Sequence, residues 1–291
     1  MRSFGDGFDG VPDNKPSYEQ ERDRCSAWDR AGSQVTSTGL YLGLIFGTLA
    51  SAASGWAIGW RSSTPRAQRP RRVPRLLRAS VLVVASLGLT AGVGQLSRVS
   101  LVRRVDEGIL RDVLATRSPG LSRLMLDVTE VGNTTGTAVA LALVVAAVAA
   151  HRRQYLFPVV SFVAFFLCVR IQRFVDKIDL RPKPSLATAI GPVGGFPSGG
   201  TARTLLVAGI IAALLAPYLG RRRVRAGLGA VVALLTWIEL ASRLILGRHW
   251  VLDVVGGCVL GGLLLAAAVP FLDVPVPGDR AARRSRSSRP G

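Results

Sequence analysis

The sequence predicts an all-α membrane protein, a polytopic bundle of transmembrane helices. Of its 291 residues, 49% are hydrophobic and 19% are charged, and the mean hydropathy is +0.35. The apolar residues form runs of about 17 to 23 residues, the length that an α-helix needs to cross a bilayer. Arginine-rich segments separate these runs. Length, composition and pattern therefore exclude the disordered, collagenous and disulfide-stabilised classes.

Seven runs are predicted to span the membrane. They cover residues 38–60, 79–96, 134–150, 156–175, 201–219, 226–246 and 251–272. The stretch 101–131 differs from them, because its leucines, isoleucines and valines stand among charged residues. This pattern predicts amphipathic helices in the membrane interface rather than an eighth span.

The chain divides into four predicted parts. Residues 1–36 are polar, with five basic and seven acidic residues, and we expect a disordered extracytoplasmic tail. Residues 37–78 hold the first span and a basic cytoplasmic loop. Residues 79–275 form a six-span membrane domain, and residues 276–291 form a basic cytoplasmic tail. The architecture is thus a six-span core with one helix added in front.

The formal net charge of +19 is concentrated in alternate loops. Arginines crowd residues 61–78, 152–153, 221–225 and 280–289, which places these segments in the cytoplasm by the positive-inside rule. The loops 176–200 and 247–250 then face the extracytoplasmic side of the membrane. Arginine-rich composition with abundant alanine, glycine and valine favours a bacterial plasma membrane. We expect membrane lipids as partners and no nucleic acid, because no aromatic residues interleave with the basic ones.

Histidine and cysteine limit the available chemistry. The three cysteines, Cys25, Cys168 and Cys258, have no metal-ligand spacing, so we predict no metal and no cofactor. The two histidines are His151 and His249. Since His151 falls at the cytoplasmic end of its span, imidazole chemistry on the outer side must use His249.

The segment 242–253, Ser-Arg-Leu-Ile-Leu-Gly-Arg-His-Trp-Val-Leu-Asp, carries the clearest chemical signal. On a helix beginning near His249, Asp253 lies four residues on and on the same face. Its carboxylate could accept the Nδ1 proton and leave Nε2 free to attack an electrophile. Arg243 offers forked donors to an oxyanion. The alternative is an ordinary interfacial loop that contains a histidine.

Two further outer segments suggest anion binding. Residues 194–201, Gly-Gly-Phe-Pro-Ser-Gly-Gly-Thr, open a span, and glycines before a helix N-terminus let backbone N–H groups approach a phosphate. The alternative there is a turn in which Ser198 is an N-cap. Residues 176–184 place Lys177 and Lys183 beside Arg181, which predicts a cationic phosphate clamp; the alternative is a solvated loop.

These segments and their order resemble the type 2 phosphatidic acid phosphatase (PAP2) superfamily, whose pattern is KxxxxxxRP, PSGH and SRxxxxxHxxxD. The third motif is present in full, the second reads Pro-Ser-Gly-Gly at 197–200, and the first keeps Arg181-Pro182. The likeness covers roughly residues 79–275.

The resemblance implies a metal-independent phosphoryl transfer through a phosphohistidine. His249 would be the nucleophile and Asp253 its orienting partner. The implied phosphate-binding residues are Arg243, Arg181, Ser198, Gly199, Lys183 and Lys177.

The sequence departs from the family pattern at two places. A first-motif lysine seven residues before Arg181 would fall on Phe174, and Arg173 and Lys177 fit only with a shifted register. Gly200 stands where the family has the histidine that protonates the leaving group. Asp179 is the remaining nearby side chain that could protonate the leaving group.

The loss of that acid favours a particular substrate. An alkoxide leaving group needs a proton in the transition state, whereas a lipid phosphate leaving from a diphosphate is a weak base, with a second pKa of about 6. We therefore expect a polyprenyl diphosphate or related lipid phosphate as substrate, hydrolysed or transferred to an acceptor.

Two other functions stay open. One is a degenerate PAP2-like protein that binds anionic lipid without turnover. The other is a transporter, because Glu239 lies within a span. Glu239 could instead pair with Arg243 four residues on, with Arg203 as a competing partner.

Overall fold

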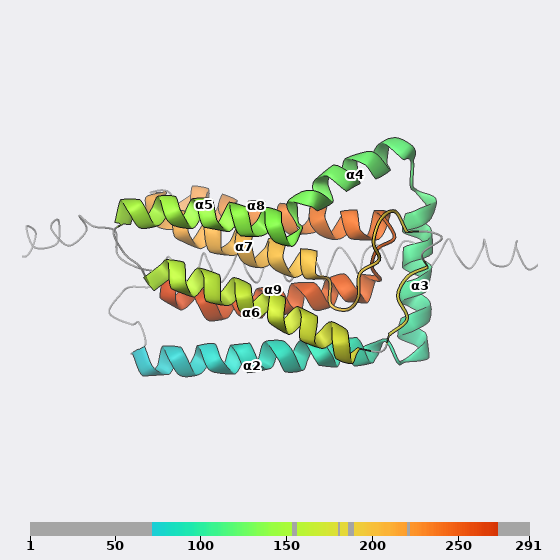
Figure 1. Cartoon of the computed structure of the whole chain (residues 1–291), viewed down its shortest axis with the longest axis horizontal. Helices are drawn as coiled ribbons and strands as arrows, with labels where there is room; N and C mark the ends of the chain where they lie inside the picture. Colours follow the sequence, from blue (N-terminus) through green and yellow to red (C-terminus); the bar gives the residue numbers. More distant parts are fainter. Residues whose placement is uncertain (1–71, 153–155, 180, 186–188, 220–221, 273–291) are drawn as a thin grey trace, which may run out of the picture.

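The computed structural model describes residues 72–152, 156–179, 181–185, 189–219 and 222–272, which form a helical bundle (Figure 1). Both predicted tails and the predicted first span at 38–60 lie outside these residues. The helices are α2 (Arg72–Leu96), α3 (Ser100–Ala115), α4 (Pro119–Val131), α5 (Thr134–Arg152), α6 (Leu156–Ile178), α7 (Gly199–Leu215), the 3₁₀ turn η2 (Ala216–Tyr218), α8 (Arg222–Ile245) and α9 (Val251–Leu272).

Six of these helices, α2 and α5 to α9, are long and apolar enough to cross a membrane. They correspond to six of the seven predicted spans, so the predicted multi-pass helical architecture is confirmed for the described residues. Some predicted spans are shorter than the helices in the structure. Helix α2 begins before residue 79, and α6 continues past residue 175 to Ile178. Polar and charged residues can extend a helix beyond the apolar stretch that marks its span.

Helices α3 and α4 interrupt the series of spans, as the sequence predicted. Helix α3 lies across one end of the bundle, and α4 slants from it toward α5 (Figure 1). Helix α4 begins where the Ser118 hydroxyl accepts a hydrogen bond from the Leu121 N–H at 3.2 Å, with Pro119 in its first turn. The inward face of α3 buries Asp106, Ile109 and Leu110.

Helices α7 and α9 form the buried centre of the bundle. Two glycines of α9 allow the close approach: a Cβ at Gly257 would lie 2.6 Å from the Ser198 carbonyl oxygen, and one at Gly261 would lie 2.5 Å from that of Ala202. Small residues at this spacing let the backbones of two membrane helices meet. Helix α7 is therefore held in place along its first turns, where the glycine-rich segment ends.

The outer helices present apolar side chains to their surroundings. Val84 of α2, Phe166 of α6 and Leu234 of α8 are among the exposed large hydrophobic residues. In a soluble protein such exposure would be unfavourable, whereas in a bilayer these side chains contact lipid.

The end of the bundle covered by α3 collects the chemically interesting segments. Helices α2, α6 and α8 end there, and α7 and α9 begin there (Figure 1). The segments that connect α6 to α7 and α8 to α9 are consequently neighbours. We call this region the α3 end.

Candidate active site at the α3 end of the bundle

His249 and Asp253 lie side by side at the start of α9, as their spacing predicted, but the helix begins at Val251, so His249 precedes it and only Asp253 lies in its first turn. His249 Nδ1 lies 3.4 Å from Asp253 Oδ2, and both residues are buried. The same carboxylate oxygen accepts a hydrogen bond from the Trp250 N–H at 2.9 Å. Within the described residues, His249 Nδ1 has no hydrogen-bond partner. The two side chains are therefore adjacent, while Asp253 is engaged by the backbone of its own helix.

Backbone hydrogen bonds join the segment between α6 and α7 to the segment between α8 and α9. The Gly194 N–H donates to the Arg248 carbonyl oxygen at 2.9 Å, and the Ile190 N–H donates to that of Leu246 at 2.8 Å. Gly194 lies directly against the imidazole, because a Cβ there would be 2.2 Å from His249 Nε2. Any larger residue at this position would displace the nitrogen proposed below as the nucleophile.

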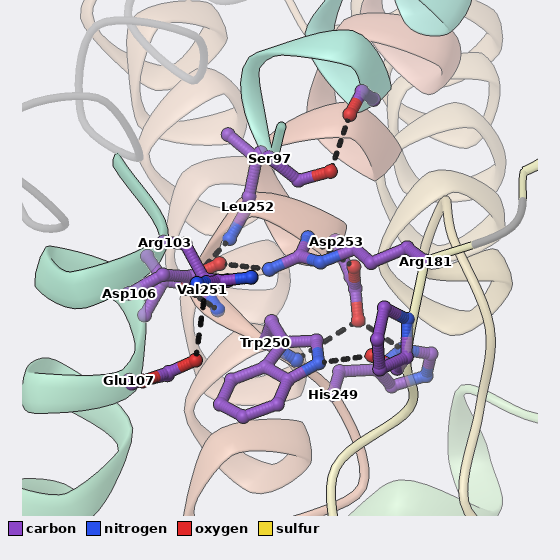
Figure 2. Close-up of polar contacts among 12 residues, drawn as sticks. Ser97, Arg103, Asp106, Glu107, Arg181, His249, Trp250, Val251, Leu252 and Asp253 are labelled. Atoms are coloured by element: carbon purple, nitrogen blue, oxygen red, sulfur yellow. Dashed lines mark hydrogen bonds and ion pairs between the residues drawn. The ribbon is translucent and has the colours of Figure 1, made fainter. Parts of the chain in front are cut away.

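Arg181 lies between two carboxylates from different helices (Figure 2). One of its terminal nitrogens donates to Asp253 Oδ1 at 2.9 Å, and the other pairs with Asp106 Oδ2. The guanidinium carbon also lies 5.6 Å from the centre of the Trp250 ring, in cation–π range. Trp250 is itself fixed by a 2.9 Å hydrogen bond from its indole N–H to the Pro182 carbonyl oxygen. Arg181 is thus tightly positioned beside Asp253.

Asp106 is a site residue that the sequence reasoning missed. Its Oδ1 accepts hydrogen bonds from the Val251 N–H at 2.7 Å and the Leu252 N–H at 3.3 Å, so it caps α9 from a different helix. Burial raises the pKa of Asp106, and Arg181 opposes that rise. A sequence signal existed: Asp106 shares one face of α3 with the buried Ile109 and Leu110, and a lone charge on an apolar face needs a partner.

Arg243 is paired with Glu239, one turn earlier on α8. Arg243 Nε donates to Glu239 Oε1 at 2.7 Å, and Nη2 lies 2.6 Å from the same oxygen. The Thr129 carbonyl oxygen of α4 accepts a longer, 3.4 Å bond from Nη2. This is the ion pair that the spacing of the two residues offered as the alternative to a role for Glu239 in transport.

The Pro197-Ser198-Gly199-Gly200 turn is tied to α9. The Ser198 N–H donates to the Asp253 carbonyl oxygen at 2.8 Å. Ser198 is at the N-cap position of α7, which the sequence predicted as the alternative to a phosphate-binding turn. Its hydroxyl, however, makes no capping hydrogen bond. The hydroxyl instead accepts a 3.1 Å bond from the Thr201 hydroxyl. The turn therefore takes its position from α9.

Each glycine of this turn faces an arginine. A Cβ at Gly200 would lie 2.4 Å from Arg243 Nη2 and 2.4 Å from Glu239 Oε1, and a Cβ at Gly199 would lie 2.7 Å from Arg203 Nη1. Real Cβ contacts this short do not occur, so the two glycines make room for the guanidinium groups. The Arg243–Glu239 pair occupies the space that a side chain at position 200 would enter.

Lys177 and Lys183, by contrast, are exposed, and neither makes an ion pair with a described residue. Arg173 is exposed on α6. Asp179 is more enclosed: burial raises its pKa, and one of its carboxylate oxygens has no hydrogen-bond partner among the described residues. It lines a cavity of about 250 Å³ together with Arg181 and Trp250.

His151 is separated from this region by the length of a helix. It lies in the last turn of α5 and packs against Tyr218, with ring centres 5.5 Å apart and ring planes tilted by 56°. Tyr218 follows the C-terminal end of α7, whereas the glycine turn forms its N-terminal end. In the described part of the chain, no group of three or more His, Cys, Asp or Glu side chains is arranged to hold a metal ion.

The α3 end combines a buried histidine–aspartate pair, two arginines and a glycine-rich helix start. Residues 178–274 match the model of the PAP2 superfamily. The predicted resemblance is confirmed over these residues. They include Arg181, the glycine turn and the whole of the segment 242–253.

A solved structure supports the same fold over a larger part of the chain. It is a transmembrane PAP2 type phosphatidylglycerolphosphate phosphatase from Bacillus subtilis, 22% identical in sequence, with a TM-score of 0.57. The likeness covers 63% of this chain and 92% of that chain. No match was found among curated proteins.

Proposed function

We propose that this chain is a membrane lipid phosphatase or phosphotransferase that acts through a phosphohistidine at His249. The substrate class is a lipid diphosphate, such as a polyprenyl diphosphate, or a related lipid phosphate presented at the extracytoplasmic face. One observation carries the proposal: a buried His249–Asp253 pair lies beside Arg181 at the α3 end. The PAP2 match and the fold shared with a PAP2 type phosphatase support it.

The chemistry proceeds in two displacements. His249 Nε2 attacks the terminal phosphorus, a nitrogen–phosphorus bond forms, and the bond to the bridging oxygen breaks, which releases the lipid monophosphate. The proton on Nδ1 is held near Asp253 as the imidazole gains positive charge. Water, or an acceptor hydroxyl, then attacks the phosphohistidine and regenerates the imidazole.

The neighbouring groups stabilise the charge of the transferring phosphoryl group. Arg181 and Arg243 supply cationic donors, and Ser198 with the Gly199 N–H lines the N-terminus of α7. Such electrostatic stabilisation does not depend on a general acid when the leaving group is a phosphate. This is why Gly200 is compatible with turnover of a diphosphate.

An apolar cavity supports a lipid as substrate. It has a volume of about 510 Å³ and lies between α5, α7 and α8. Its walls are formed by residues such as Val207, Ile211 and Leu235, and Glu239 also lines it. Such an apolar lining accommodates a hydrocarbon chain.

The test is phosphate release by purified protein in detergent, without divalent metal, from a polyprenyl diphosphate and from phosphatidic acid. We expect release from the diphosphate and at least a 10³-fold loss in His249→Ala, on the order of removing a covalent nucleophile. Equal release by wild type and His249→Ala would refute a phosphohistidine. Faster turnover of phosphatidic acid than of the diphosphate would refute the leaving-group argument.

Binding of anionic lipid without turnover is the second candidate function. The observation that favours it is that Arg181 and Arg243 are already paired with carboxylates, while His249 Nδ1 has no hydrogen bond within the described residues. This function predicts lipid binding that survives His249→Ala, with no phosphate release from any substrate by the wild type.

A further inference from the structure

Arg203 is a buried cation that the proposed transfer to His249 does not use. It lies four residues into α7, and 8% of its surface is exposed. No described residue forms a hydrogen bond or an ion pair with it, and its Nε is enclosed without an acceptor. A guanidinium group removed from water without a partner is unfavourable, so its retention inside a membrane helix points to a ligand.

The side chain reaches the glycine turn. A Cβ at Gly199 would lie 2.7 Å from Arg203 Nη1. In the same way, a Cβ at Gly200 would lie 2.4 Å from Arg243 Nη2. Two guanidinium groups therefore lie against two successive glycines, at the N-terminus of α7. Backbone N–H groups at a helix start add further positive potential there.

The charges around this pair do not balance. Glu239 lies within electrostatic range of both arginines and of His249, but its hydrogen bonds go to Arg243. Arg173 adds a further positive charge within electrostatic range of Arg203. The buried Arg203 and the partly buried Arg243 thus share one carboxylate, and the excess positive charge belongs to Arg203.

We propose that Arg203 binds the second phosphate of a diphosphate substrate, the one that leaves with the lipid. The inference rests on the proposed function and specifies its substrate. As the bond between the terminal phosphorus and the bridging oxygen breaks, negative charge accumulates on the departing lipid phosphate. Arg203 stabilises that charge, as an ionic hydrogen-bond donor that needs no proton transfer. A lipid monophosphate places no charge at this position.

The experiment compares two substrates that carry the same lipid chain, farnesyl diphosphate and farnesyl monophosphate. Arg203→Gln is expected to lower kcat/KM for the diphosphate by about 10- to 100-fold, the range for losing a hydrogen bond to a charged group, and to change the monophosphate rate less than about twofold. Arg170→Gln is the matched control, because Arg170 is exposed on α6 and stacks on Phe166. Equal losses for both substrates, or no loss for either, would overturn the inference.

Two additions make the result decisive. Should Arg203→Gln fail to fold, Arg203→Lys keeps the charge without the forked donors, and its expected loss is smaller but still confined to the diphosphate. Should the wild type release no phosphate at all, the proposed function fails, and the inference is tested by thermal stabilisation with inorganic diphosphate against inorganic phosphate. Preferential stabilisation by diphosphate that Arg203→Gln removes supports the subsite; identical stabilisation in the two proteins contradicts it.

Discussion

Restoring a histidine at position 200, where the PAP2 pattern has one, is expected to impair this protein. The Cβ alone would lie 2.4 Å from Arg243 Nη2 and 2.4 Å from Glu239 Oε1, against ordinary contacts of 3.4 Å or more. Each group would have to retreat by roughly 1 Å, and overpacking of this kind costs about 1–3 kcal/mol. A displacement of about 1 Å in a group that positions a phosphate can lower a rate by about 10²-fold. We therefore expect Gly200→His to lose activity with a modest fall in stability.

The assay pairs thermal unfolding in detergent with kcat/KM for a polyprenyl diphosphate. Gly200→Ala isolates the effect of the Cβ, and Gly227→Ala is the control, because a Cβ at Gly227 on α8 would meet nothing within 4 Å. In the double variant Gly200→His/Glu239→Ala, space is released, and we expect a less-than-additive loss. A Gly200→His protein as active and as stable as the wild type would refute the assignment of that volume to the Arg243–Glu239 pair.

Three further outcomes follow from the structure. Asp106→Asn leaves the buried Arg181 with one carboxylate and is expected to lower the free energy of unfolding by about 3–5 kcal/mol in a chemical denaturation experiment, whereas an unchanged midpoint would contradict the pairing. Burial raises the pKa of Asp179 above its ordinary 3.8, so the folded protein binds the carboxyl proton more tightly than the unfolded chain does. Ionisation of Asp179 therefore destabilises the fold as the pH rises through 3.8. Asp179→Asn should therefore raise Tm at neutral pH, with a gain that shrinks as the pH is lowered toward 4; a pH-independent difference would show another cause. Gly261→Ala brings a Cβ to 2.5 Å from the Ala202 carbonyl oxygen and should lower Tm, while a stabilised variant would show that α7 and α9 are not packed this closely.

Local spacing made the histidine–aspartate pair predictable. His249 and Asp253 are four residues apart, and although α9 begins only at Val251, this short spacing across the start of the helix keeps the two side chains adjacent. The same argument predicted the Glu239–Arg243 pair on α8. The spans were predictable because apolar length is a property of the chain itself.

Contacts between distant segments were not predictable in this way. Asp106 is 75 residues from Arg181 in sequence, and their pairing depends on how α3 crosses the end of the bundle. Phe196 is buried where a Cβ at Gly94 of α2 or at Gly256 of α9 would meet its ring, and nothing in its own segment indicates those neighbours. Lys177 was grouped with Arg181 by proximity in sequence, but α6 continues to Ile178 and leaves Lys177 exposed on the last turn.

The site draws on more of the chain than the segment that matches the PAP2 superfamily. That match begins at residue 178, yet Arg181 pairs with Asp106 of α3, and Arg243 donates to the Thr129 carbonyl oxygen of α4. Asp106 also caps α9, the helix that carries Asp253, so one carboxylate fixes both the arginine and the helix beside which it lies. The amphipathic helices therefore do more than cover the end of the bundle: they hold the cations and the first turn of α9 in a single arrangement. A segment that began at residue 178 would leave both arginines without these partners, because the positions of its charged groups depend on helices that precede it.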